Sequence, residues 1–355
     1  MTAIQDLLAA RLAEGPVPAA EVMALALYHP ECGYYRRSQG PWGFAGADYY
    51  TALDLGPLLG EALCLRLQGA WEALDRPDPF TVLEPGAGRG WLGRDILRAA
   101  TGSFAEALRY IHRDDNPAAR AAAQEALAPW PDRVRFAAEG ETLAPFRGAV
   151  LSNELFDALP AQPWRWDGAR WTREVLTAGG PAWIPGEACE ATAWYAAHAQ
   201  DGLESGDGGP WCEGLPALVA QLAAPLEAGL FLAIDYGEQA SRLVDKGADL
   251  RRYKGHQVDG NWWEDLGESD LTADVDFTRL AQLLGGQGFQ PAATLTLSRW
   301  IREHAPLAAW EGEWMALDPA ARMKRMENLL QLTLPTMMGE RFRVLEAWKG
   351  GNPQA

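Results

Sequence analysis

The stretch 82-VLEPGAGRGWLGRDIL-97 joins a short apolar run to a helical pattern through a turn rich in glycine. In this turn Glu84 is followed by Gly86, Gly88 and Gly90 at every second position. Because glycine has no side chain, a glycine turn between a strand and a helix lets backbone amides come close to a ligand. The stretch therefore predicts a ligand-binding turn or, in the simpler alternative, a turn that only packs a helix tightly on a strand.

The spacing of the glycines separates three kinds of ligand. A phosphate-binding P-loop requires GxxxxGK followed by Ser or Thr, and the stretch lacks that ending. The dinucleotide fingerprint GxGxxG is present as 88-GRGWLG-93, but it begins late, after Glu84 and Gly86. The whole pattern, Glu84-x-Gly86-x-Gly88-x-Gly90, is that of class I methyltransferases that use S-adenosyl-L-methionine (SAM). We therefore predict SAM as the cofactor, with S-adenosyl-L-homocysteine as its product, and assign these four residues to its binding.

The next predicted strand, 109-RYIHRD-114, ends on an acidic residue, Asp114. A carboxylate at the end of such a strand can accept hydrogen bonds from both ribose hydroxyls of the cofactor. We assign this role to Asp114. The adjacent Asp115 is the alternative, and in the simplest case Asp114 is a solvated loop carboxylate.

From residue 80 onward, short apolar strands alternate with helical patterns. This alternation predicts parallel β-α-β units with helices on both faces of one sheet. We expect an α/β, Rossmann-like class I methyltransferase fold with a seven-stranded, mostly parallel sheet. The expected strands are 80–84, 109–114, 134–138, 148–153, 229–237, 293–301 and 342–350, and the expected helices are 58–74, 91–100, 117–127, 215–228 and 276–289.

Additional segments are predicted around this core, which we place at residues 57–350. Residues 1–56 combine helix-like apolar spacing with a loop rich in Gly and Tyr, and we expect a helical segment and a cofactor-covering loop. We also expect a hairpin insertion at about 161–210, with its turn at 167-DG-168, and a cap insertion at about 238–276.

The composition argues against several classes of function. The 355 residues include 31 Lys and Arg against 48 Asp and Glu, which gives a formal charge of -17. This balance argues against binding to nucleic acid, and it suits either solubility alone or a cationic substrate. The four cysteines form no CxxC pair and the five histidines no HExxH pattern, so we expect no metal site.

The sequence also predicts neither a targeting peptide nor a membrane segment. The stretch 1-MTAIQDLLAARLAEG-15 carries acidic residues early and lacks the apolar core of a signal peptide. No apolar run reaches the ~18 residues that a membrane-spanning helix needs. Together with cysteines that we expect to be reduced, these features predict a cytoplasmic protein without a membrane partner.

The chain resembles the MidA-like family, whose mitochondrial members are complex I assembly methyltransferases that act on a protein arginine. The matching motifs occur in order over nearly the whole chain, and NELFDALP directly after a strand is the most specific of them. They are 27-LYHPECGYY-35, 48-DYYTALDLGPLLGE-61, 83-LEPGAGRGWLGRDIL-97, 153-NELFDALP-160, 171-WTREV-175, 234-IDYG-237, 251-RRY-253 with His256, 270-DLTADVDF-277 and 338-MGERFRVL-345. The resemblance implies SAM-dependent methylation of a protein arginine.

The sequence departs from the family pattern mainly on the acceptor side. The family's GDF motif reads 47-ADY-49 here, its TSPE or TAPE motif reads 51-TALD-54, and the usual histidine of the DLTAHVDF-like motif is Asp274. Two alternatives therefore stay open. The chain could be a small-molecule N- or O-methyltransferase of a biosynthetic pathway, or a non-catalytic assembly factor that retains the fold.

Two carboxylates after the fourth strand are the candidate catalytic groups. Asn153 ends the run 148–153, and Glu154 and Asp157 follow it at the carboxyl edge of the predicted sheet, where α/β folds bind ligands. On a helical turn Glu154 and Asp157 would share a face, and two carboxylates can hold a guanidinium through paired hydrogen bonds. In the alternative, Asn153 caps a helix whose early acids interact with its dipole. We assign Asn153 to the cofactor and the two carboxylates to catalysis.

The remaining candidates lie in loops. Asp48 and Thr51 belong to a glycine-flanked loop that we expect to fold over the cofactor. Asp270 and Asp276 are candidates for binding the acceptor, and His256 is a candidate catalytic base because the pKa of free imidazole lies near neutrality.

Methyl transfer from a sulfonium is a direct in-line displacement that needs positioning rather than a covalent enzyme intermediate. This requirement fits a sequence without a Ser/His/Asp or Cys/His signature. We expect an arginine-bearing protein or a small molecule as acceptor, no nucleic-acid partner, and we allow for a homodimer.

Overall fold

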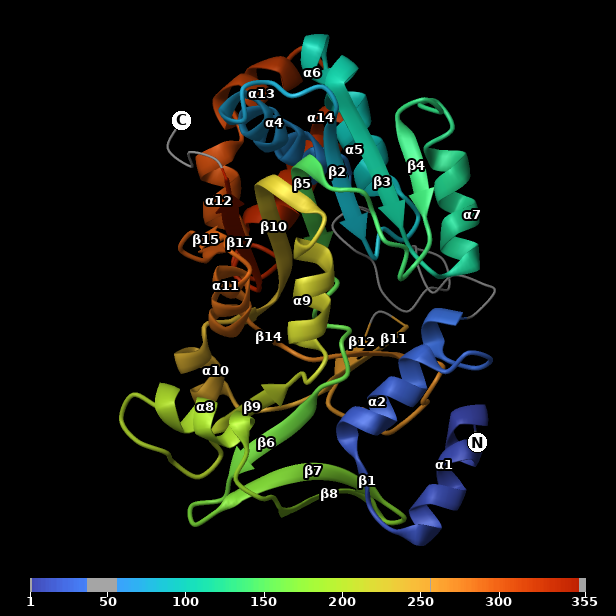
Figure 1. The fold of residues 1–355 in the computed structure, drawn as a ribbon, viewed down its shortest axis with the longest axis vertical. Helices are drawn as coiled ribbons and strands as arrows, with labels where there is room; N and C mark the ends of the chain where they lie inside the picture. Colours follow the sequence, from blue (N-terminus) through green and yellow to red (C-terminus); the bar gives the residue numbers. More distant parts are fainter. Residues whose placement is uncertain (1, 37–55, 256, 351–355) are drawn as a thin grey trace. The chain divides into compact units, whose positions relative to one another are not determined.

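A computed structural model describes residues 2–36, 56–255 and 257–350. The chain forms two compact units, whose segments can be followed by colour in Figure 1. We call them the N-terminal unit (Met1–Tyr49, Phe156–Ala217 and Tyr236–Leu280) and the sheet unit (Tyr50–Leu155, Leu218–Asp235 and Ala281–Ala355). The insertions predicted at about 161–210 and 238–276 fall within two segments of the N-terminal unit, and the predicted domain limits stay a prediction.

The sheet unit is built on a mixed sheet whose main path has the order β15-β17-β10-β5-β2-β3-β4. The pairs β4/β3, β3/β2, β2/β5 and β5/β10 are parallel, and β15 is antiparallel to β17. The predicted α/β fold with a mostly parallel sheet is confirmed, although within the described residues this sheet has nine strands, seven of them on its main path. The strands are β2 Phe80–Pro85, β3 Leu108–Arg113, β4 Val134–Ala137, β5 Phe146–Asn153, β10 Leu226–Glu238, β15 Gln290–Pro291 and β17 Phe342–Lys349, with the short β14 Val275–Asp276 beside β10 and β16 Leu295–Thr296 beside β17.

The order of the strands reverses between β2 and β5. The chain runs outward from β2 through β3 to β4, then returns to the other side of β2 with β5 and β10. In open α/β sheets ligands bind at the carboxyl ends of the strands at such a switch point. The predicted glycine turn after β2 and the NELFDALP motif after β5 both begin there.

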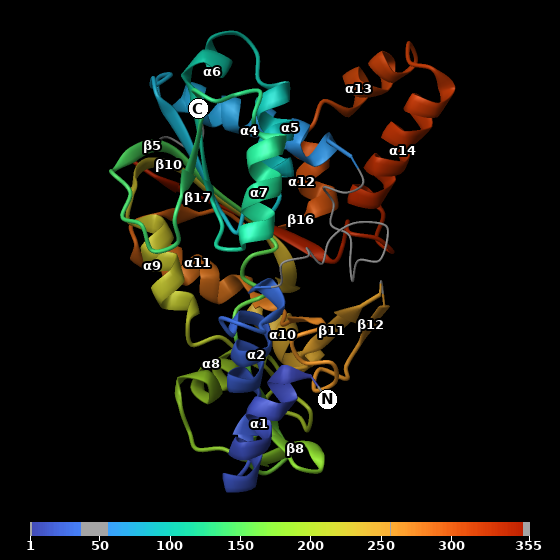
Figure 2. The same ribbon diagram turned by 90° about the vertical axis from the view of Figure 1, so that its right-hand side faces the viewer.

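Helices pack on both faces of this sheet, and Figure 2 shows α9 on one side and α5 and α7 on the other. Local signals account for their starts: Asn116 caps α7 by accepting from the N–H groups of Ala118 and Ala119, and Pro117 occupies the first turn. The helices are α4 Leu58–Ala73, α5 Trp91–Ala99, α6 Gly102–Ala107, α7 Pro117–Ala126, α9 Leu215–Ala223, α11 Phe277–Gly286, α12 Leu297–His304, α13 Leu307–Trp314 and α14 Pro319–Thr333.

Two predicted elements are wrong. The run 293–301 was predicted as a strand, but only β16 is extended and α12 follows it directly. The Thr296 side chain accepts from the Arg299 N–H and starts the helix, which buries Leu297, Trp300 and Ile301 at helical spacing. Alternating threonines ahead of these residues favour a strand and obscured that spacing. The helix predicted at 215–228 is also too long, since α9 ends before β10 begins.

The N-terminal unit contains two small antiparallel sheets and four α-helices within the described residues. One sheet has the order β1-β7-β6-β9 with β8 beside β7, and the other has the order β12-β11-β13. The predicted hairpin is confirmed as β6 and β7, and the Asp167 N–H donates to the Arg170 carbonyl at its turn. The elements are α1 Ala3–Glu14, β1 Val17–Pro18, α2 Ala19–Tyr28, the 3-10 helix η1 Tyr34–Arg36, β6 Gln162–Trp166, β7 Trp171–Thr177, β8 Gly180–Pro185, α8 Glu190–His198, β9 Gly208–Trp211, α10 Ala240–Lys246, β11 Arg251–Lys254, β12 Gln257–Asp259 and β13 Asp270–Thr272.

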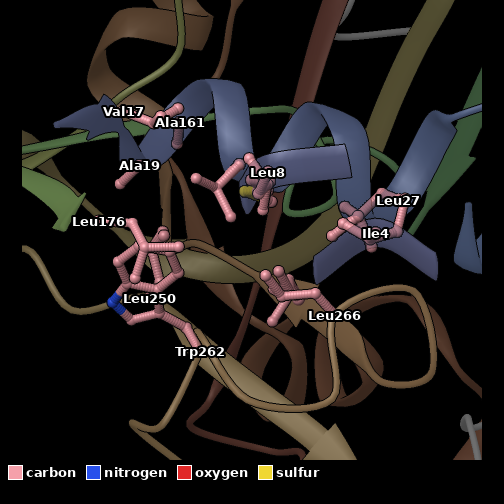
Figure 3. Packing of buried hydrophobic residues seen from close by; sticks show 14 of the residues in the cluster. Ile4, Leu8, Val17, Ala19, Leu27, Ala161, Leu176, Leu250, Trp262 and Leu266 are labelled. Atoms are coloured by element: carbon pink, nitrogen blue, oxygen red, sulfur yellow. The ribbon is translucent and has the colours of Figure 1, made fainter. Parts of the chain in front are cut away.

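One hydrophobic cluster ties the N-terminal helices to the later segments of this unit. Figure 3 shows Leu8 of α1 and Leu27 of α2 with Leu250, Trp262 and Leu266 from the far part of the sequence. All five side chains are at most 2% exposed. Residues 1–30, which the sequence predicted only as helical, therefore supply half of a shared core.

We predict that Leu8→Ala lowers the free energy of unfolding by about 2–5 kcal/mol, because it removes buried methyl groups and leaves a cavity. Leu7→Ala is the matched control: Leu7 is the adjacent residue of α1 and is 45% exposed, so its loss should change stability by less than about 0.5 kcal/mol. Chemical denaturation of both variants measures the difference. Equal effects would contradict the packing shown in Figure 3.

Candidate active site at the switch point of the sheet

The three glycines of the turn after β2 have left-handed backbones but different surroundings. Gly86, Gly88 and Gly90 have φ of +63°, +50° and +69°. A Cβ on Gly86 would lie 2.9 Å from Leu155 Cδ1, and a Cβ on Gly90 would lie 2.9 Å from Leu127 Cδ1. A Cβ on Gly88 would meet no atom of the described chain within 4 Å. A side chain at Gly86 would therefore displace the end of Leu155, and one at Gly90 would crowd Leu127 and Ala123, whereas at Gly88 the backbone borders open space that a ligand can enter.

Two side chains of β3 and that of Asp114, the residue after β3, hold this turn. Tyr110, His112 and Asp114 occupy every second position, so they point to the same face of the sheet. The Tyr110 hydroxyl donates to Glu84 Oε2 at 2.6 Å, and His112 Nε2 lies 2.9 Å from the Gly88 carbonyl oxygen. The Gly88 N–H donates to Asp114 Oδ2 at 2.8 Å. Three consecutive same-face residues thus fix the segment that the sequence assigns to SAM.

Asp114 joins the glycine turn to the start of α7. Its Oδ1 accepts from the Asn116 N–H at 2.7 Å while Oδ2 accepts from Gly88. Asp115, the alternative, instead accepts from the Glu139 N–H at 3.2 Å. Each carboxylate oxygen has more than one acceptor position, so Asp114 can still accept ribose hydroxyls, and this role stays a prediction.

Glu84 is a buried acid whose pKa is raised above its ordinary value. Its side chain is 3% exposed, and burial raises the pKa of its carboxyl to about 8. The Tyr110 hydrogen bond works against this rise in pKa, and the negative charge of Asp114 adds to it. Glu84 is therefore mainly protonated at neutral pH in the protein without ligand.

The backbone turns sharply at Glu154, directly after β5. Glu154 has φ +52°, which is uncommon for a residue with a side chain, and its N–H donates to the Ile234 carbonyl at 2.9 Å. The next N–H, of Leu155, donates to Asp235 Oδ2 at 3.1 Å. Two hydrogen bonds to β10 therefore hold the half-buried Glu154 at the switch point.

Asn153 presents a polar atom suited to a ligand. Its Nδ2 donates to Glu154 Oε1 at 3.1 Å, while its Oδ1 is buried and has no hydrogen-bond partner among the described residues. A buried carbonyl oxygen without a partner costs free energy, and an ammonium group would satisfy it. The Gly88 backbone borders open space, and the Asn153 Oδ1 atom can accept from an ammonium group. Both properties suit the methionine portion of SAM.

The expectation that Glu154 and Asp157 share a face of a helical turn is wrong. Residues 154–160 contain no helix, and Asn153 caps none. The left-handed backbone of Glu154 is incompatible with the start of a right-handed helix, so the chain bends and forms a turn before β6. The spacing of the two acids therefore does not place them on one surface.

Asp157 belongs to the N-terminal unit and has its own charged surroundings. Its side chain is 4% exposed, and burial raises the pKa of its carboxyl to about 7 although the positive charge of Arg251 lowers it. Arg251 Nη2 lies 2.7 Å from Asp274 Oδ1, and Lys246 Nζ also donates to Asp274. Asp274, where the family pattern has histidine, thus anchors two cations of this unit.

The other acceptor-side candidates lie in different places. Asp270 accepts from the Tyr35 hydroxyl at 2.8 Å. Asp276 accepts from Trp194 Nε1 at 2.7 Å and from the Arg279 N–H at 3.0 Å in the first turn of α11. Their assignment to the acceptor stays a prediction. Asp48, Thr51 and His256 lie outside the described residues.

Four residues of these sites were missed from the sequence: Tyr110, His112, Asp235 and Arg251. The signal for the first two was available, because Tyr110, His112 and Asp114 alternate along one predicted strand. Asp235 lies within the quoted motif 234-IDYG-237, but nothing in the sequence indicates that it accepts from the Leu155 N–H.

Within residues 2–36, 56–255 and 257–350, none of the helices has both the length and the apolarity needed to cross a bilayer. Within the same residues no group of three or more His, Cys, Asp or Glu side chains is arranged to hold a metal ion.

Comparisons with known proteins also indicate a SAM-dependent methyltransferase. Residues 62–294 match the model of a protein family described as "Putative S-adenosyl-L-methionine-dependent methyltransferase". The chain is 28% identical to the protein arginine methyltransferase NDUFAF7, mitochondrial, of Danio rerio, over 94% of this chain and 83% of that protein. It is 27% identical to the NDUFAF7 homolog of Drosophila melanogaster, over 96% and 83%.

A solved structure supports the fold and the cofactor. A crystal structure of a Burkholderia thailandensis protein bound to S-adenosyl-homocysteine has a TM-score of 0.85 and 25% sequence identity. The similarity covers 99% of this chain and 94% of that one.

We predict that Gly88→Leu weakens S-adenosyl-homocysteine binding at least about a hundredfold, roughly 3 kcal/mol, because the new side chain enters the space next to the turn. Gly102→Leu is the matched control, since Gly102 is also left-handed, with φ +57°, and also has no atom within 4 Å of its Cβ position. Both variants carry similar backbone strain, but Gly102 starts α6 at the other edge of the sheet. Titration calorimetry on folded protein measures both, and unchanged binding by Gly88→Leu would refute this placement of the cofactor.

We also predict that Glu84→Gln changes the pH dependence of stability. Between the ordinary pKa of about 4.5 and about 8, the unfolded chain loses the Glu84 proton while the folded protein keeps it. The wild-type free energy of unfolding should therefore fall by roughly a few kcal/mol over this range relative to Glu84→Gln. Denaturation from pH 5 to pH 8.5 measures this, with the exposed Glu125→Gln as control. Parallel curves for wild type and Glu84→Gln would rule out a buried neutral Glu84.

Proposed function

We propose that this chain, which belongs to the family of S-adenosyl-L-methionine-dependent methyltransferases, transfers the methyl group to an arginine side chain of a protein. Membership of the family rests on the match over residues 62–294. The proposed acceptor is supported by the relatives, which are named protein arginine methyltransferases, and by the chemistry of the switch point. The observation that carries it is the half-buried Glu154 carboxylate on a strained backbone at that point.

When bound, SAM would supply the methyl group of its positively charged sulfur: the acceptor nitrogen would displace S-adenosyl-homocysteine as the leaving group and would give up one proton. The residues of the chain then have positioning roles. The Gly88 turn, Glu84, Asp114 and Asn153 would hold the cofactor. A carboxylate such as Glu154 can hold a guanidinium through charge-assisted hydrogen bonds and orient the nitrogen that accepts the methyl group. Orientation of this kind can supply ~7–11 kcal/mol of the lowering of the barrier.

The location of the protein and its oligomeric state are part of the same proposal. We propose that the protein is cytoplasmic, and we allow for a homodimer. The relatives of known location are named mitochondrial, and that name applies to them. Cell fractionation of the source organism and light scattering of the purified protein test these two points.

The reaction is tested by transfer of labelled methyl from SAM into an extract of a host strain that lacks this gene, followed by hydrolysis and separation. Label in methylated arginine would support the proposal and identify the target band. Label only in small molecules would favour the alternative of a small-molecule methyltransferase. No label, from protein that binds SAM, would favour an assembly factor that retains the fold.

We predict that Glu154→Gln lowers the rate of arginine methylation at saturating SAM by at least about a hundredfold, because the carboxylate that orients the guanidinium loses its charge. The affinity for S-adenosyl-homocysteine should change by less than about threefold, or about 0.7 kcal/mol. Glu227→Gln, an exposed acid at the start of β10, should leave both values unchanged. A Glu154→Gln enzyme that retains full activity would exclude Glu154 from acceptor binding.

A further inference from the structure

His112 is a buried polar residue that the reaction does not use directly. It is 0% exposed, and in the sheet it lies between Glu84 of β2 and Phe136 of β4. Its ring contacts the ring of Phe136, with 5.0 Å between centroids. Among the described residues, its side chain makes one hydrogen-bond contact outside β3, the 2.9 Å approach of Nε2 to the Gly88 carbonyl oxygen.

The partner of His112 decides which ring nitrogen carries the proton. A carbonyl oxygen only accepts, so Nε2 must be the N–H donor. The Nδ1 atom is buried and has no hydrogen-bond partner among the described residues. A neutral ring with a bare Nδ1 satisfies this arrangement better than an imidazolium, which would bury a second N–H without an acceptor. Burial lowers the pKa of His112 in the same direction.

Together with Asp114, His112 holds both polar groups of Gly88. Asp114 accepts from the Gly88 N–H, and His112 donates to the Gly88 carbonyl. These two bonds fix the peptide planes on either side of Gly88 and hence its left-handed backbone. No side-chain packing can do this, because glycine has none and its Cβ direction is open.

We propose that His112 is a positioning residue for the cofactor, which holds the Gly88 peptide in its SAM-binding orientation through the Nε2–H hydrogen bond. Packing alone does not explain the residue, since an apolar ring would fill the same space against Phe136 without leaving a buried nitrogen unpaired. The inference rests on the SAM site and is independent of the identity of the methyl acceptor.

The test compares two substitutions that differ in hydrogen bonding. His112→Phe keeps a ring beside Phe136 and removes the donor, whereas His112→Gln removes the ring and retains an N–H donor. We expect His112→Phe to weaken S-adenosyl-homocysteine binding about tenfold, since it leaves the Gly88 carbonyl unpaired. His112→Gln should restore binding to within about threefold of wild type, a difference of less than about 1 kcal/mol. The control Phe136→Leu should lower thermal stability without changing the affinity.

Three outcomes would overturn the proposal. They are wild-type affinity in His112→Phe, an equal loss in His112→Gln and His112→Phe, or an equal loss in Phe136→Leu. If His112→Phe does not fold, the tautomer of the His112 ring in the wild-type protein still tests the proposal. Long-range ¹H–¹⁵N spectra of histidine-labelled protein near neutral pH should show a neutral ring protonated at Nε2. A ring protonated at Nδ1, or at both nitrogens, would exclude the hydrogen bond to Gly88.

Discussion

The site depends on one constraint: the backbone at Gly88 must be held in a left-handed conformation although glycine has no side chain that could pack. A residue that must leave space for a ligand cannot be fixed by its own packing, so the fixing groups have to come from a neighbouring element. Strand β3 and the residue after it supply them because their side chains alternate: Tyr110 reaches Glu84, and His112 and Asp114 reach the two sides of Gly88. Side chains at and just after β3 thus hold the loop that follows its neighbour in the sheet, β2.

The protonation of Glu84, which lies in the same region, can respond to a charged ligand. A buried acid with a pKa of about 8 is mostly neutral at pH 7, and a positive charge nearby favours its ionised form. A cationic cofactor bound next to Glu84 would therefore favour loss of the Glu84 proton. The strong negative charge of the chain favours the approach of such a cation but does not select it.

Much of the fold could be predicted because its signals are local. Buried parallel strands appear as short apolar runs, and the glycine turn marks the edge where they end. What could not be predicted depends on contacts between distant residues. The three glycines look equivalent in the sequence, yet Gly86 and Gly90 lie against the side chains of Leu155 and Leu127 while Gly88 faces open space. The helix α12 was hidden because two threonines favoured a strand, and its buried face is visible only in the folded chain.

The pair Glu154 and Asp157 shows how spacing can mislead about chemistry. Three-residue spacing suggests a shared helical face, but the left-handed Glu154 breaks that geometry, and the two acids enter different surroundings. Asp157 is buried and already interacts with the charge of Arg251, so a second guanidinium would compete with a resident one. Glu154 is more exposed, and its left-handed backbone costs of order 1–3 kcal/mol and persists only because the surrounding structure enforces it. Because two hydrogen bonds to β10 enforce that conformation at the ligand edge of the sheet, Glu154 is the better candidate for the group that meets the acceptor.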